Sequence, residues 1–293
     1  MLARARIMSY IVPMNKLSIE KRAQIFRCYA EGNSLRATAR LTGACYNAVL
    51  QFLPKIGLLC SDYQDKTFRN LKCKRVQCDE IWAFVGCKEK QVTAEKKAKG
   101  QGDCWTWTAL DAETKLTFCW FVGSRDGMAA YHFMQDVAGR LANRVQMTTD
   151  GHRPYLQAVE SAFGSEIDYA QLVKIYGKPE EGGEARYSPA QCMGARKAAI
   201  SGTPDYAHVS TSYAERQNLN IRMGNRRFTR LTNAFSKKVE NHEHMVAAYL
   251  MHYNFCRIHQ TLRVTPAMQA GITDHVWEAE EVIALLDAQA KAA

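Results

Sequence analysis

The sequence predicts an α+β protein in which a mixed β-sheet is flanked by helices and preceded by an all-α module at the amino terminus. Residues 1–75 have helical periodicity and carry 14 Lys or Arg against 4 Asp or Glu, so this module holds the whole net charge of +10. After it come three segments of strand composition, and then helical and strand segments alternate, which is the order of an α+β sheet. A basic module joined to a neutral one indicates nucleic-acid binding.

Within the basic module, residues 15–75 are expected to form a helix-turn-helix DNA-binding region followed by a linker. Ser18 and Ser34 are typical N-cap residues for its first two helices. A third helix is expected at 44–53, ending at Pro54 because proline interrupts the backbone hydrogen bonds of a helix interior. A small helical bundle with a solvated basic face is the alternative interpretation.

A turn containing Gly43 separates the second and third helices, which is the arrangement of a helix-turn-helix whose second helix lies in the major groove. The predicted recognition helix offers three exposed polar or aromatic side chains that we expect to contact DNA: Tyr46, Asn47 and Gln51.

Residues 76–85, 105–110 and 116–122 are rich in β-branched and aromatic residues and predict a three-stranded antiparallel meander. Residues 88–102 between the first two strands are rich in lysine and glycine, and are equally consistent with a solubilising hairpin tip and with a DNA contact. The later elements are expected in this order: a helix at 128–141, a strand at 145–149, a helix at 153–163, a strand at 167–169, an insertion with partial structure at 177–208, a helix from about 211, a helix at 237–255 and an acidic helix or tail at 273–293.

The composition excludes several other classes of protein. Ten scattered cysteines with no Cys-x-x-Cys pair indicate free thiols in a reducing cytosol rather than a disulfide scaffold or a zinc site. No apolar run approaches the roughly 18–20 residues of a membrane span, so we expect a cytoplasmic protein. Residues 1–14 are expected to be a disordered extension, or to precede a translation start at Met14.

Three carboxylates fall where a sheet could bring them together. Asp79 lies in the first predicted strand, Asp150 at the end of the fourth, and Glu215 in the first turn of a later helix. If the first and fourth strands are neighbours, these acids could hold two divalent cations about 3.5–4 Å apart, as two-metal phosphoryl-transfer sites do. Taken singly, Asp150 is an ordinary strand ending, and Glu80 points to the opposite sheet face because side chains alternate along a strand.

Four motifs in order carry a resemblance to a known family: Gln77-Cys78-Asp79-Glu80-Ile81-Trp82, Thr149-Asp150-Gly151, Tyr213-Ala214-Glu215-Arg216-Gln217-Asn218, and Tyr253-Asn254-Phe255-Cys256-Arg257-Ile258-His259 with Thr265-Pro266-Ala267. Over residues 76–272 the chain resembles the DDE transposases, and among them the bacterial insertion sequence 1 family. The resemblance implies a ribonuclease H-like fold and two Mg²⁺ or Mn²⁺ ions. It also implies a catalytic and metal-binding triad of Asp79, Asp150 and Glu215.

Two features depart from that family. Glu215 follows Asp150 by 65 positions, much farther than in compact integrase-type members, and residues 177–208 account for the excess. The basic module also lacks the paired-cysteine zinc motif of many relatives, which shifts DNA recognition to the predicted helix-turn-helix.

The helix that carries Glu215 continues into a basic stretch. Its side chains are expected to bind DNA phosphates, with a solvated, ion-paired helix face as the alternative: Asn218, Arg222, Arg226 and Arg227. Arg257 and His259 are expected to support the site, either by orienting the scissile phosphate or by packing the last helix.

The predicted function is a DNA transposase that cleaves insertion-sequence ends and joins them to target DNA without a covalent enzyme intermediate. We expect it to act as a homo-oligomer on the DNA of a bacterial nucleoid. The alternatives are a ribonuclease H-like nuclease or resolvase, and a catalytically inactive DNA-binding regulator. A tyrosine recombinase is disfavoured, because no tyrosine follows the segment that ends at Arg263.

Overall fold

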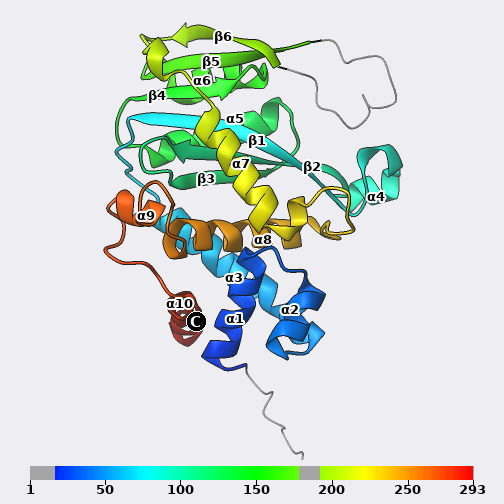
Figure 1. Ribbon diagram of the computed structural model, residues 1–293. Helices are drawn as coiled ribbons and strands as arrows, with labels where there is room; N and C mark the ends of the chain where they lie inside the picture. The colour runs from blue at the N-terminus through cyan, green and yellow to red at the C-terminus, as the bar shows by residue number, and fades with distance from the viewer. Residues whose placement is uncertain (1–16, 178–191, 293) are drawn as a thin grey trace, which may run out of the picture.

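The computed structural model describes residues 17–177 and 192–292, and its centre is a six-stranded mixed sheet flanked by helices (Figure 1). The α+β prediction is therefore confirmed, and the architecture is compatible with a ribonuclease H-like fold. The expected extension at 1–14 lies outside the described residues. The strands are β1 (Arg75–Val85), β2 (Gly102–Asp111), β3 (Thr117–Gly123), β4 (Val145–Asp150), β5 (Ile167–Tyr176) and β6 (Cys192–Ser201).

The strands lie in the order β3-β2-β1-β4-β5-β6. The predicted meander is confirmed, because β1 pairs with β2 and β2 with β3 in antiparallel register. The chain then crosses to the other side of β1, where β4 pairs parallel to β1 and β5 parallel to β4. The first and fourth strands are thus neighbours, which is the condition that the carboxylate prediction required.

The far edge of the sheet corrects the prediction for the segment before Glu215. β5 continues to Tyr176, well beyond the three residues expected, and β6 pairs antiparallel with it inside the expected insertion. Nearly every residue of β6 is exposed, so this strand has no alternation of buried and exposed residues by which its period could be recognised. Residues 178–191 lie outside the described part of the chain.

Helices cover both faces of the sheet. On one face, α5 (Gly127–Arg140) and α6 (Pro154–Phe163) pack over Trp107, whose ring contacts Phe133 and Tyr155. On the other face, α7 (Ser212–Gly224) and α8 (Val239–Met251) form a separate apolar cluster with Ile81. Side chains alternate along β1, so its successive residues face α6 and α7 in turn.

The first two amino-terminal helices have the predicted bounds, while their assignment to a helix-turn-helix stays a prediction. Ser18 and Ser34 cap α1 (Ile19–Ala30) and α2 (Leu35–Thr42) as expected. The third helix, α3 (Tyr46–Thr67), begins two residues later than predicted and does not end at Pro54. The proline removes one backbone hydrogen bond, but the turns on both sides of it are held by burial against α8.

At the end of the molecule opposite β6, the helices α1, α2, α3 and α10 lie together (Figure 1). The acidic carboxy-terminal segment forms α10 (Ala279–Ala292), whose Asp287 accepts two hydrogen bonds from Arg22 of α1, at 2.8 and 2.6 Å. Short helices are α4 (Ala94–Ala98) in the lysine-rich loop and α9 (Pro266–Gln269). No helix of the described part of the chain is both long and apolar enough to cross a membrane.

Candidate metal centre

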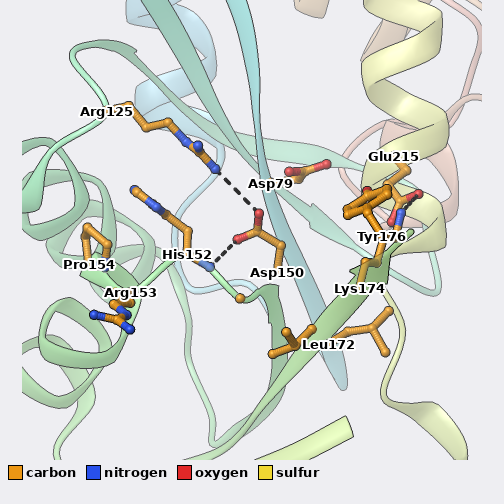
Figure 2. Close-up of a pocket in the computed structure, with 12 residues that line it drawn as sticks. Asp79, Arg125, Asp150, His152, Arg153, Pro154, Leu172, Lys174, Tyr176 and Glu215 are labelled. Carbon is orange, nitrogen blue, oxygen red and sulfur yellow. Dashed lines mark hydrogen bonds and ion pairs between the residues drawn. The ribbon is translucent and has the colours of Figure 1, made fainter. Parts of the chain in front are cut away.

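A cavity of about 660 Å³ opens where β4 ends beside β1, and the three predicted acids all line it (Figure 2). The parallel pairing of β1 with β4 ends at Gln77 and Thr148, and Asp79 and Asp150 each lie two residues beyond this pair, with ligand oxygens within 4.8 Å of each other. Glu215 reaches the cavity from the first turn of α7, and the position of this turn is set by Gln77, whose side-chain oxygen accepts from the backbone N–H of Tyr213 at 2.8 Å. The long segment before Glu215 therefore does not keep the three apart.

The tightest group of acids includes a residue that the sequence analysis left out. Ligand oxygens of Asp79, Glu80 and Asp150 all lie within 4.8 Å of one another. The predicted alternation holds, because Asp79 accepts from Asn218 of α7 at 2.9 Å while Glu80 accepts from Tyr155 of α6 at 2.9 Å. Asp150 is the last residue of β4, so no further residue of that strand lies between its carboxylate and the two carboxylates of β1.

Burial, followed by neighbouring like charges, raises the pKa values of Asp79 and Glu80. Burial and then the neighbouring charges of Glu80, Asp150 and Glu215 raise the pKa of Asp79 to about 7, against the one backbone N–H of Glu80 that lowers it. The pKa of Glu80 is raised by burial and by Asp150, and Arg125 opposes that shift. A group of carboxylates with such pKa values is stabilised by a cation.

The guanidinium of Arg125 places a positive charge beside these carboxylates. Its Nε lies 2.7 Å from Oε1 of Glu80 and its Nη2 lies 3.6 Å from Oδ2 of Asp150. The other oxygen of Asp150 accepts from the backbone N–H of His152 at 2.9 Å, which fixes the carboxylate (Figure 2). No pattern in the sequence marks Arg125, because it lies in the loop after β3 and meets the acids only through the fold.

Glu215 is held differently from the two aspartates. Its Oε2 lies 2.6 Å from Nζ of Lys174 on β5 (Figure 2). Its Oε1 accepts from the hydroxyl of Thr211. Lys174 lies beyond the end of the strand predicted at 167–169, so the sequence analysis did not single it out. In this arrangement the glutamate is at the cavity wall but its charge is neutralised by a lysine.

The other predicted site residues separate into three groups. Asn218 is buried and orients Asp79, and Arg222 is half-buried with its pKa lowered by burial and by Arg230, against the charge of Asp79. Arg226 and Arg227 follow α7 and are half-buried; Arg227 donates to the Ala234 carbonyl at 3.4 Å. Elsewhere, Tyr46, Asn47 and Gln51 are exposed on α3, while Arg257 and His259 line a separate cavity.

The residues present fit a hard divalent cation. Mg²⁺ and Mn²⁺ prefer oxygen ligands, and the group offers three carboxylates whose mutual repulsion a cation would relieve. Asp79, Asp150 and Glu80 would hold the first ion, and Glu215 would become a ligand once Lys174 releases it.

The stability of the metal-free protein is expected to fall as pH rises from about 4 to about 7. Asp79 retains its proton in the folded state up to a pKa of about 7, whereas in the unfolded chain it ionises near the ordinary aspartate pKa of 3.8. The folded state therefore binds more protons in this window, and the penalty is fully present above it. Asp79→Asn should remove this contribution and stabilise the metal-free protein at about pH 8 by on the order of 1–3 kcal/mol.

Urea unfolding in EDTA at about pH 5 and about pH 8 measures this effect as the difference between wild type and variant. Adding Mg²⁺ at the higher pH should stabilise the wild type and leave the variant nearly unchanged. An equal response of both proteins to pH and to Mg²⁺ would contradict the assignment of Asp79.

Compared with known proteins, the chain matches no family model and none of the curated proteins.

Proposed function

We propose that this protein is a DNA transposase of the DDE type, which cleaves and joins phosphodiester bonds with divalent metal ions on a ribonuclease H-like sheet. One observation carries the proposal: the parallel pairing of β1 and β4 places Asp79 beside Asp150, and α7 adds Glu215 at the same cavity. The strand order supports the fold assignment, because three antiparallel strands are followed by two that run parallel to the first.

The side chains around the acids prepare the site for this chemistry. Bound cations would activate a water molecule or a DNA 3′-hydroxyl and stabilise the leaving oxygen. Asn218 orients Asp79, and the His152 amide orients Asp150, so both carboxylates keep their direction when the site is charged. Arg125 lies where it offsets excess negative charge, including that of an arriving phosphodiester.

Lys174 has two possible partners in this scheme. In the structure it neutralises Glu215, and a lysine displaced from the glutamate would carry its ammonium to the edge of the same cavity. There it can contact a DNA phosphate as a point charge.

The reaction needs no covalent enzyme intermediate, because water and the 3′-hydroxyl are the two nucleophiles.

The amino-terminal helices are proposed to recognise the element ends. Asn47→Ala and Gln51→Ala should each weaken binding to end DNA by about 1–2 kcal/mol, since both side chains are exposed at the start of α3 and amides read adenine edges in the major groove. Fluorescence anisotropy with end and random duplexes measures the discrimination. Gln289→Ala removes an exposed amide from α10 and serves as the control. Unchanged discrimination in both α3 variants would exclude them as base readers.

The function itself is tested with DNA that borders the gene. The purified protein, Mg²⁺ and a fragment spanning each border should give strand breaks with free 3′-hydroxyl ends at the border, followed by joining of those ends to a second DNA molecule. Breaks without joining would identify a nuclease or resolvase instead. Specific binding of the border DNA without any strand break, at all Mg²⁺ and Mn²⁺ concentrations, would indicate a DNA-binding regulator.

A further inference from the structure

A second cavity, of about 320 Å³, lies on another side of α7 and is lined by basic side chains. Lys115, Arg216, Arg257 and His259 all line it. Every residue of its lining belongs to the described part of the chain, and none of them is acidic. The cavity is thus distinct from the carboxylate cavity and opposite to it in charge.

Three segments that are remote in the sequence build this cavity. Lys115 is in the tight turn between β2 and β3, where its φ of +61° marks a left-handed backbone. Arg216 is on α7, and Arg257 and His259 follow the π-helical end of α8. The segments are tied together, because the hydroxyl of Tyr253 donates to the Lys115 carbonyl at 3.1 Å and the loop closes on itself through His259 N–H and the Val264 carbonyl at 2.9 Å.

The charges of Glu113 and Asp111 act on Lys115, but the two arginines of this cavity are not ion-paired in the described part of the chain. Within residues 17–177 and 192–292, neither Arg216 nor Arg257 forms an ion pair with a carboxylate, and Nζ of Lys115 lies 3.4 Å from the ring centre of Tyr213. Burial lowers the pKa of His259, and the charges of Lys115, Arg257 and Arg216 lower it further. The histidine is therefore neutral at neutral pH and can act as a hydrogen-bonding group among three cations.

Gln217 gives an independent indication of a ligand. It is 1% exposed and lines the cavity, and its oxygen already accepts from the side chain of Asn220 at 3.1 Å. Its amide nitrogen is buried and has no hydrogen-bond partner in the described part of the protein. A buried donor without a partner is unfavourable, so a ligand oxygen in the cavity would satisfy it. Solvated surface arginines alone would need no such donor.

We propose that this cavity binds a phosphate group, with the Gln217 amide and the cations of Lys115, Arg216 and Arg257 as its ligands. The ligand is a backbone phosphate of a nucleic-acid strand that also enters the carboxylate cavity, and this choice of source rests on the proposed function. Glu215 and Arg216 are consecutive on the first turns of α7, so the two cavities flank the same part of one helix. A free phosphate anion would use the same ligands.

Binding of a short labelled single-stranded oligonucleotide in EDTA tests the proposal, because α3 is proposed to read duplex DNA and the chelator removes divalent metal. Arg216→Gln and Arg257→Gln should each weaken binding about 10-fold and reduce the salt dependence by about one phosphate contact, a slope change of roughly 0.7. Arg257→Lys should retain most of the affinity. Lys291→Gln removes one exposed charge from α10 and should behave as the wild type.

Gln217→Glu separates a binding role from a structural one. The carboxylate has nearly the shape of the amide and can pair with the surrounding cations, so thermal unfolding should occur at the same temperature or higher while oligonucleotide binding is lost. If Gln217 had only a structural role, the unfolding temperature and oligonucleotide binding would not change in opposite directions. Thermal unfolding of each arginine variant confirms that it is folded.

Calorimetric titration with inorganic phosphate distinguishes the two sources. Variants that lose affinity for both the oligonucleotide and inorganic phosphate support the strand as ligand. Variants that lose inorganic phosphate alone support a free-anion site. Wild-type binding of both ligands by Arg216→Gln, Arg257→Gln and Gln217→Glu would overturn the proposal. Since these measurements need no divalent metal, their failure is separate from a failure of Mg²⁺-dependent cleavage.

Discussion

Asp79→Asn, Asp150→Asn and Glu215→Gln are each expected to reduce Mg²⁺-dependent cleavage and joining by about 10³-fold or more, while DNA binding in EDTA stays within about two-fold of the wild type. Each change keeps the shape of the side chain and removes one charged oxygen ligand from the cavity. A carboxamide cannot offset the charge of a hard divalent cation, so the metal and the reactive phosphate lose their common anchor. Single-turnover assays on border DNA measure the rate.

The matched control is Asp168→Asn on β5. It is the same chemical change on the same sheet, but Asp168 pairs with Arg144 at 2.7 Å and does not line the carboxylate cavity. We expect wild-type cleavage and at most a small loss of stability. Joining at the wild-type rate by any of the three site variants would remove that residue from the catalytic set, and reduced activity of the control would indicate that loss of an acid acts through the fold.

Gly57→Ala is expected to destabilise the protein by about 2–3 kcal/mol, although the same substitution normally stabilises a helix by about 0.5–1 kcal/mol. Gly57 lies within α3 at its closest approach to α8. A Cβ atom there would come within 2.3 Å of Cβ and 2.6 Å of Cα of His244. Since the nearest atoms include the backbone of α8, the two helices must move apart and lose contacts along the joint core.

Gly139→Ala on α5 is the control for this prediction. Its added Cβ would meet only the end of the Arg69 side chain, at 3.9 Å, so it should stabilise the protein slightly. Urea unfolding of both variants measures the two changes in the free energy of unfolding. A stabilising effect of Gly57→Ala would contradict the close packing of α3 on α8, and with it the continuation of α3 beyond Pro54.

Elements with strong local signals were predicted well from the sequence. Ser18 and Ser34 cap α1 and α2 because a hydroxyl that accepts from a backbone N–H three residues on is a local interaction. The meander of β1, β2 and β3 follows from three segments with strand composition, the last two of which are joined by a short turn. Asp150 ends β4 as expected, because the next residue is a glycine, which is unfavourable in a strand.

Elements stabilised by distant parts of the chain were predicted poorly. The proline in α3 breaks a local rule, and the helix continues through it because its buried residues pack against other helices, chiefly α8, which lies nearly 200 residues later. The exposed strand β6 has no period of its own, and its backbone is held by pairing with β5. In both cases tertiary contacts override the local preference.

The sequence by itself identified the acids that could meet, because Asp79 and Asp150 fall in predicted strands and Glu215 in the helix after the sheet. The tertiary structure decided that the first and fourth strands are neighbours. Only the tertiary structure decided what each acid contacts. Arg125 reaches Glu80 and Asp150 from a loop, and Lys174 pairs with Glu215 from an extension of β5. In the tertiary structure, Arg257 and His259 line a second cavity together with Gln217, and not the carboxylate cavity. The positions of strands along the chain follow from local periodicity, whereas their order in the sheet follows from how the chain packs. Ion pairs and unpartnered donors depend on side-chain positions within a few ångströms, which only the packed chain defines.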